Sequence, residues 1–355
     1  MTTTKTTTHM MARSLGVILI LALFGLDVAY AQFGSVTRNV TKRGTTAADF
    51  LSIPVGARGA AMGGAVTATV NDASAIYWNP AGLAEMRAGA GFMAEYAQWL
   101  AGIDFNFASV VLPAVGGTVG IGVTSMRTAE MDVTTVAQQN GTGETFSAGS
   151  FAVSASYGRA LTDRFSLGLT GKYVNERIWN SSANGFAVDV GTMFVTPFRD
   201  IRLGAAISNF GTKLQIAGDD LLAVVDIDPN NQGNNESNRA FLRTDAFDMP
   251  LVMRIGVAGE AFQTASSRLT LAVEALNPNN SEQYLNFGAE LGLLGDLIMF
   301  RAGYSEILLD NSVRSLALGG GLNYAFGPLD LTIDYAFEAQ EFFDNVNRFT
   351  FSAQF

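Results

Sequence analysis

The 355-residue sequence has no cysteine and a single histidine, His9. Without thiols there is neither a disulfide framework nor a cysteine nucleophile. One histidine near the start leaves no histidine-based triad and no ordinary zinc site in the rest of the chain. No other nucleophile motif takes their place. The sequence therefore predicts a protein that is not an enzyme and that uses neither a metal nor a cofactor.

Charged residues are also scarce, at 15% of the chain, whereas 48% of the residues are hydrophobic. A soluble protein of this size usually has about 25% charged residues. The formal net charge is −10, and an acidic chain argues against nucleic acid as a partner. Many apolar residues must therefore face something other than water, although they form only one long run.

That run extends from Leu15 to Val28, with Arg13 before it and Ala29-Tyr30-Ala31 after it. A basic residue, an apolar core and small residues at positions −3 and −1 are typical of a secretory signal peptide, so we expect cleavage before Gln32. The core is too short for a membrane span. Residues 1–31 are thus predicted to direct export.

The remaining apolar residues alternate with polar or small ones. Phe349, Phe351 and Phe355 share one face of the last segment, and Thr350 and Ser352 share the other. This period of two predicts a strand with lipid on one face and a polar lumen on the other, although the edge of a soluble β-sandwich would alternate too. Fourteen such segments lie near 88–98, 103–113, 117–127, 147–160, 164–177, 184–196, 201–209, 250–262, 267–276, 284–293, 297–305, 314–326, 329–338 and 347–355.

The connections between these segments alternate in length almost throughout, and the brief 99–102 loop is the exception. Short turns such as Gly327-Pro328 alternate with longer loops such as 178–183 and 210–249. Outer-membrane barrels have short periplasmic turns and longer outer loops. We therefore predict an all-β fold, a transmembrane antiparallel β-barrel of about fourteen strands over residues 88–355. A periplasmic N-terminal segment and barrel plug would precede it, over residues 32–87.

Residues 50–87 lack the alternation and are rich in small side chains. Small side chains allow close backbone packing, as a plug inside a barrel requires. Asn79-Pro80 is a turn signal, and Asp72 can cap a short alanine-rich helix. We interpret Asn79, Pro80, Ala81 and Gly82 as elements of this plug or hatch. Its role is either structural only or that of a gate.

The hatch also carries a resemblance. Residues 56–65 (Gly-Ala-Arg-Gly-Ala-Ala-Met-Gly-Gly-Ala) and 71–84 (Asn-Asp-Ala-Ser-Ala-Ile-Tyr-Trp-Asn-Pro-Ala-Gly-Leu-Ala) resemble the N-terminal signature of the PorV/PorQ family. The wider group is similar to the FadL-type (OmpP1) outer-membrane barrels, which share the Asn-Pro-Ala turn at Asn79. The resemblance implies a fourteen-stranded barrel with an N-terminal hatch in the outer membrane of a Gram-negative-type bacterium.

Two functions follow from the resemblance. PorV-like proteins serve type IX secretion, so the partners would be secretion subunits and exported cargo, bound through extracellular loops. FadL-like proteins transport long-chain fatty acids or other hydrophobic molecules past the hatch, so the partner would be a hydrophobic ligand. Outer-membrane lipid surrounds the barrel in both cases.

Charged residues within the strands fall on the face expected to line the lumen. Either they pair with one another in a closed lumen or they line a polar conduction path. These candidates are Arg254, Glu274, Glu290, Arg301, Asp330 and Asp334, together with Lys172, Asp189, Glu260 and Arg268.

The predicted loop 210–249 is acidic, and residues 226–230 begin like a calcium loop. However, Asn231 stands where glycine is needed and Ser237 where glutamate is needed, so a solvated acidic loop is the simpler interpretation. An apolar stretch, residues 221–225, is less expected there. It could cover the barrel mouth or meet a partner.

Overall fold

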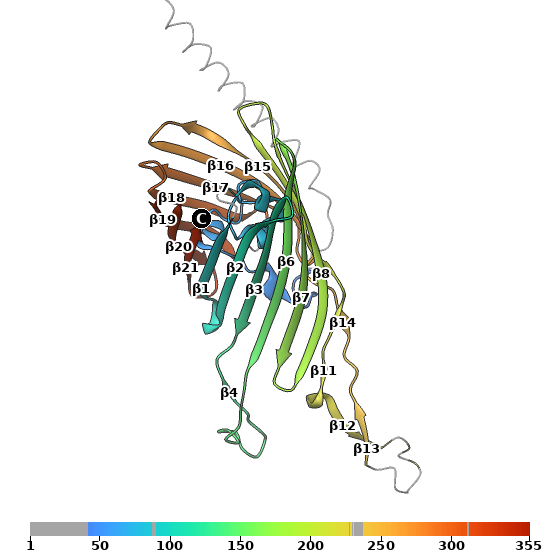
Figure 1. The fold of residues 1–355 in the computed structure, drawn as a ribbon. Coiled ribbons are helices and arrows are strands. Elements are labelled where there is room, and N and C mark those ends of the chain that lie inside the picture. The colour runs from blue at the N-terminus through green and yellow to red at the C-terminus, as the bar shows by residue number, and fades with distance from the viewer. Residues whose placement is uncertain (1–41, 87–89, 227, 229, 231–236, 311) are drawn as a thin grey trace, which may run out of the picture. The chain divides into compact units, whose positions relative to one another are not determined.

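The computed structural model describes residues 42–355 apart from 87–89, 227, 229, 231–236 and 311. The predicted signal peptide and its cleavage site lie outside the described residues. Fourteen antiparallel strands form a closed barrel (Figure 1). They are β1 (Gly91–Gln98), β2 (Asp104–Ala114), β3 (Gly117–Arg127), β6 (Ala148–Thr162), β7 (Phe165–Ile178), β8 (Ser181–Val195), β9 (Arg202–Gly211), β15 (Val252–Gln263), β16 (Ser267–Pro278), β17 (Tyr284–Leu293), β18 (Ile298–Ile307), β19 (Arg314–Phe326), β20 (Leu329–Gln340) and β21 (Val346–Gln354).

Each of these strands pairs with the next one along the chain, and β1 closes the ring on β21. In this closing pair Gly91 lies opposite Gln354, and Gln98 lies opposite Asn347. The prediction of an all-β barrel of about fourteen strands with an N-terminal plug is confirmed. No helix in the described part of the chain is long and apolar enough to span a membrane.

The prediction of a loop over residues 178–183 is wrong. β7 continues to Ile178 and β8 begins at Ser181, so only Trp179 and Asn180 connect them. Trp179 has a φ of 49°, as a tight two-residue hairpin turn requires. The small and polar residues that begin β8 show no hydrophobic alternation, so the sequence pattern gave no sign that the strand continued there.

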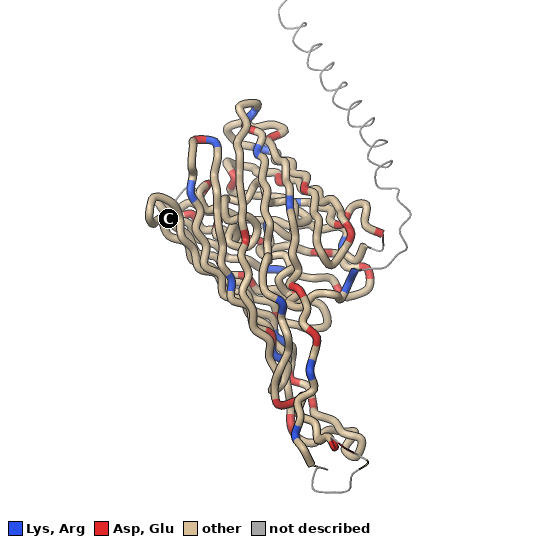
Figure 2. The backbone as a smooth tube through the Cα atoms, turned by 90° about the vertical axis from the view of Figure 1, so that its right-hand side faces the viewer, with Lys and Arg blue, Asp and Glu red and all other residues tan. Residues whose placement is uncertain are grey.

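The two faces of the strands differ as the alternation predicts. On β8, Phe186, Val188 and Val190 point outward and are exposed, whereas Ala187 and Asp189 between them are buried in the lumen. Figure 2 shows few charged positions along the barrel strands. A continuous outer surface of exposed apolar side chains is what a lipid-facing barrel wall requires.

The hatch, residues 50–86, lies inside the barrel. It contains part of η1 (Asp49–Ser52), then α2 (Ala57–Ala61), α3 (Ala75–Trp78) and η2 (Pro80–Glu85). Its interior side chains are almost all buried, including Val55, Met62 and Leu83. Asp72 accepts hydrogen bonds from the amide and hydroxyl of Ser74, which is the N-cap residue of α3.

The chain enters the barrel at the long-loop end. The Ala47 amide donates to the Asp248 carbonyl, and Asn280 donates to Thr46 and Asp49. From there the hatch crosses the lumen and joins β1 at the short-turn end. We expected residues 42–49 to lie on the periplasmic side, but they lie at the long-loop end. The sequence could not show this, since this short polar segment has no pattern that fixes its direction.

The longest loop, between β9 and β15, forms an arm that extends away from the barrel and does not cover its mouth (Figure 1). Short pairs of strands build the arm: β10 (Leu214–Gln215) with β14 (Ala246–Phe247), and β12 (Leu222–Val225) with β13 (Asn238–Phe241). Between β10 and β12 lie β11 (Ala217–Gly218), which pairs with β8, and η4 (Asp219–Leu221). The loop between β3 and β6 contains a similar pair, β4 (Met131–Asp132) and β5 (Thr145–Phe146).

Much of the stretch considered as a calcium loop lies outside the described residues. Within the residues that the structure describes, no group of three or more histidine, aspartate or glutamate side chains could hold a metal ion.

Candidate functional site in the lumen

The hatch rests on a row of glycines in the barrel wall. Gly158, Gly168 and Gly191 lie side by side in register on β6, β7 and β8. A Cβ on Gly168 would collide with the backbone of Pro80 and Ala81. The Asn-Pro-Ala turn therefore packs directly against the sheet backbone, with no wall side chain between them.

Asn79 fixes this turn in place. Its side chain is fully buried and donates to the carbonyls of Thr67, 2.8 Å away in the hatch, and Thr192, 3.1 Å away in β8. Its Oδ1 accepts from the Ala81 amide, which caps η2. Pro80 occupies the first position of that helix, where its missing N–H leaves no partner unsatisfied.

Gly82 completes the predicted hatch elements. A Cβ on Gly82 would lie 2.5 Å from the Val70 carbonyl oxygen, so no larger residue fits there without movement. Two further pairs of wall glycines receive other parts of the hatch. Gly204 and Gly256 face Thr67 and Ala68, and Gly288 and Gly303 face Met62 and Gly63.

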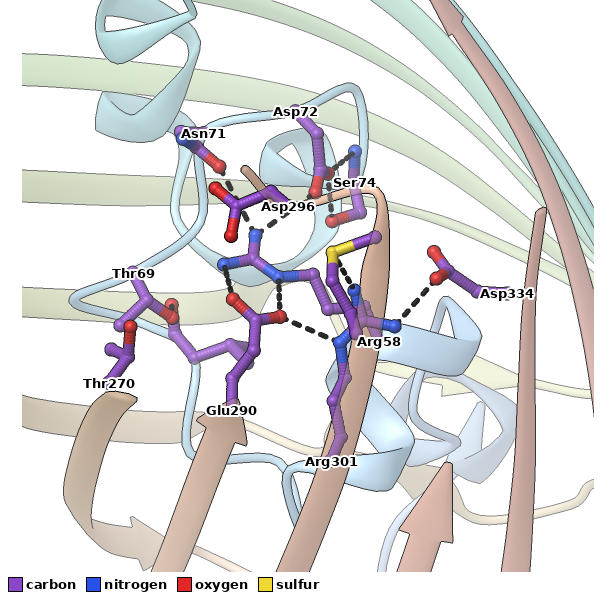
Figure 3. Close-up of polar contacts among 12 residues, drawn as sticks. Arg58, Thr69, Asn71, Asp72, Ser74, Thr270, Glu290, Asp296, Arg301 and Asp334 are labelled. Atoms are coloured by element: carbon purple, nitrogen blue, oxygen red, sulfur yellow. Dashed lines mark hydrogen bonds and ion pairs between the residues drawn. The ribbon is translucent and has the colours of Figure 1, made fainter. Parts of the chain in front are cut away.

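Glu290 on β17 is the centre of an ionic cluster between hatch and wall (Figure 3). Its carboxylate is fully buried and accepts from Arg58 of the hatch at 3.0 Å, from Arg268 at 2.8 Å and from Arg301 at 2.6 Å. Arg301 also pairs with Asp334 at 2.6 Å. One carboxylate is thus shared by three guanidinium groups, which are drawn from the hatch, β16 and β18.

Arg58 is the residue through which the hatch joins this cluster. Besides Glu290, it contacts Asn71 at 3.1 Å and Asp72 at 3.3 Å (Figure 3). Burial alone would lower the pKa of the Arg58 guanidinium, but the carboxylates of Glu290 and Asp72 raise that pKa above its ordinary value. Arg58 therefore stays charged, and its charge ties α2 both to the wall and to the loop before α3.

The remaining predicted lumen residues make separate contacts. Glu274 accepts from the amide and hydroxyl of Thr67, both at 2.9 Å, and Arg254 lies 3.9 Å from Glu274. Asp330, by contrast, is exposed at the end of the lumen. Three more candidates are paired at the wall: Lys172 pairs with Asp189 at 2.6 Å, and Glu260 pairs at 2.8 Å with Arg202, which was not a candidate.

A polar cavity of ≈ 420 Å³ lies beneath the hatch on the short-turn side. Arg58, Glu290, Asp330 and Asp334 line it, together with Asp296 of the β17–β18 turn. On the long-loop side of the hatch there is a pocket of only ≈ 40 Å³. The hatch lies between these two spaces.

Sequence reasoning did not assign a role to two residues of this site. Arg58 was part of the signature but was given no role, because its partner Glu290 lies 232 positions away. Arg348, which is fully buried between Glu95 and Glu338, was not among the lumen candidates. The alternation places Arg348 on the inner face of its strand, away from the outward Phe349 and Phe351, and this pattern could have identified Arg348 as a lumen residue.

The exposed apolar wall, the polar lumen and the hatch define the class of protein: this is an outer-membrane β-barrel protein. The family described as type IX secretion system protein PorV matches residues 36–221, and the chain belongs to this family. The family predicted from the hatch motifs is thus confirmed. A search of curated proteins gave no match.

Solved structures show the same fold. The monoaromatic hydrocarbon channel CymD is 15% identical, with a TM-score of 0.54 over 85% of this chain and 98% of that chain. The Pseudomonas putida toluene transporter TodX is 13% identical, with a TM-score of 0.55 over 84% of this chain and 96% of that chain. At these identities the similarity concerns the fold alone.

Proposed function

We propose that this protein is a component of type IX secretion that acts through protein–protein contacts of its extracellular loops, and that it has no catalytic activity. Membership of the PorV family supports the secretion role. The observation that carries the proposed mode of action is the arm between β9 and β15. By the rule that long loops lie outside, the arm faces the cell exterior.

The arm exposes apolar side chains where no lipid would cover them. Val224 on β12 is 68% exposed and Phe241 on β13 is 64% exposed, with Leu222 and Leu242 exposed beside them. An isolated two-stranded hairpin is at best marginally stable in water. Exposed apolar residues on such an element favour a binding surface that a partner covers.

The backbone of the arm favours the same conclusion. Among the described strands, β12 and β13 pair only with each other, so each has one edge that no other described strand covers. A strand from a partner can add to such an edge, with the backbone supplying affinity and the side chains supplying specificity. The partners that fit this proposal are type IX secretion subunits and exported cargo.

The experiment is recovery of the tagged protein from cross-linked native outer membranes, with bound proteins identified by mass spectrometry. We expect secretion subunits, or exported proteins that share a C-terminal domain, to be recovered with the wild type. The double variant Val224→Ser/Phe241→Ser should reduce that recovery about tenfold or more, because apolar anchors at the centre of an interface each contribute about 2 kcal/mol.

Val136→Ser is the matched control. Val136 is 95% exposed on the loop between β3 and β6, at the same end of the barrel but outside the arm. Its substitution should leave recovery unchanged. If the arm variant and the wild type recover the same partners in equal amounts, the arm is not the contact surface.

Transport of a hydrophobic small molecule is the second candidate, and the likeness in fold to the CymD and TodX channels favours it. The hatch would have to move during transport. Extraction of lipids from the purified protein provides the test. If the barrel is recovered without protein partners but with bound fatty acid or another hydrophobic molecule, transport becomes the preferred function.

A further inference from the structure

A small pocket lies above the hatch, on the long-loop side. The pocket of ≈ 40 Å³ there is lined by Tyr77 and Trp78 of the hatch and by Arg254, Tyr284 and Arg314 of the wall. Tyr77 and Trp78 pack edge to face, with ring centroids 4.9 Å apart. The pocket therefore combines aromatic walls with two guanidinium groups.

Arg254 is buried here without a close anionic partner. Arg254 is 6% exposed, and its Nε has no hydrogen-bond partner among the described residues. The nearest carboxylate, Glu274, is 3.9 Å away and already accepts two hydrogen bonds from Thr67. The rings of Tyr77 and Trp78 hold the Arg254 guanidinium, with centroids 5.6 and 5.1 Å from its Cζ.

The other polar groups of the pocket do not neutralise Arg254. Glu338 pairs with Arg348 at 2.5 Å, and Glu306 accepts from Ser312 at 3.0 Å and from the Val313 amide at 3.1 Å. The side-chain oxygen of Asn286 accepts a hydrogen bond from the Glu306 amide. The side-chain NH₂ of Asn286 therefore lies beside Gly64 at the pocket. A buried guanidinium with an unmade hydrogen bond is costly, so a ligand that supplies the acceptor stabilises the site.

The size of the pocket limits that ligand. One water occupies roughly 10–15 Å³ on this measure, so the pocket admits a group of about three heavy atoms. A long acyl chain does not fit, whereas a carboxylate or a phosphate oxygen pair does. The aromatic walls favour an apolar or aromatic group next to the anion.

We propose that this pocket binds the anionic head group, a carboxylate or a phosphate, of a small molecule that enters from the long-loop side. Arg254 and Arg314 hold the anion, and Tyr77, Trp78 and Tyr284 contact the part that follows it. The site is independent of the secretion role proposed for the arm, because none of its residues belongs to that arm.

Tryptophan fluorescence of the purified protein in detergent tests the site, because Trp78 lies beside Arg254 and Trp99 lies 5.3 Å from Arg314. The probes are sodium benzoate, sodium acetate, inorganic phosphate and neutral benzyl alcohol. We expect a saturable change with benzoate and none with benzyl alcohol. Tighter binding of benzoate than of acetate identifies an aromatic carboxylate, whereas tighter binding of phosphate identifies a phosphate compound.

Arg254→Gln should weaken binding of the preferred anion at least about tenfold, because a hydrogen bond to a charged group is lost. Arg314→Gln, at the partly exposed rim, provides a second test if Arg254→Gln does not fold. Arg202→Gln is the control, since Arg202 lies near the short-turn end, and it should leave affinity unchanged. The proposal is overturned if no anion gives a saturable signal, or if both pocket variants bind as the wild type does.

Discussion

Gly168→Ala is expected to displace the hatch from the barrel wall. The added Cβ would collide with the Pro80 carbonyl carbon and the Ala81 amide nitrogen, which are backbone atoms that cannot rotate away as a side chain can. Overpacking of this kind costs about 1–3 kcal/mol. A cost of about 2 kcal/mol would raise the population of displaced hatch ~30-fold.

Trypsin cleavage provides the measurement, because Arg58 is the only basic residue between positions 50 and 86. In the wild type Arg58 is held in the ionic cluster, so cleavage there requires the hatch to open. If opening and closing are fast compared with cleavage, the rate follows the open population. Cleavage after Arg58, followed by mass spectrometry, should therefore be ~30-fold faster in Gly168→Ala.

The control is on the same strand. Gly171 faces outward, and a Cβ there would meet nothing within 4 Å. Trypsin should cleave Gly171→Ala at nearly the wild-type rate, because substitutions at exposed positions change stability by about 0.5 kcal/mol or less. Equal cleavage rates in the two variants would show that the glycine row does not seat the hatch.

The barrel was predictable because each strand separates two environments. Wherever lipid lies outside and the lumen lies inside, the sequence must alternate, as β20 does with Ile333 exposed and Asp334 buried. The same reasoning explains the error at Trp179. The first residues of β8 lack hydrophobic alternation, so no pattern distinguished them from a loop.

The candidate site was less predictable, because it depends on contacts between distant parts of the chain. The alternation placed Glu290 and Arg301 on the inner face, but it could not show that Arg58 joins them. The glycine row depends on cross-strand register, which aligns Gly158 with Gly168 and Gly191. In the sequence these three glycines have no common spacing, and although the alternation places Gly168 on the inner face and Gly171 on the outer face, nothing there shows that the hatch packs against Gly168.

Glu290→Gln is expected to have a larger effect on the hatch than Gly168→Ala. The substitution keeps the shape of the side chain but removes the single carboxylate that Arg58, Arg268 and Arg301 share. Removing one partner of a buried ion pair costs about 3–5 kcal/mol, because the other charge remains buried without compensation. Arg58 is the member that can leave, since it belongs to the hatch and not to a strand.

Trypsin cleavage after Arg58 should accelerate at least ~150-fold in this variant, which is the factor that about 3 kcal/mol gives. Planar-bilayer recordings should show rare channel openings that the wild type lacks. Asp330→Asn is the matched control, because Asp330 lines the same cavity but is exposed. If Glu290→Gln is cleaved no faster than Asp330→Asn, the cluster does not retain the hatch, and the packing against the glycine row must hold it alone.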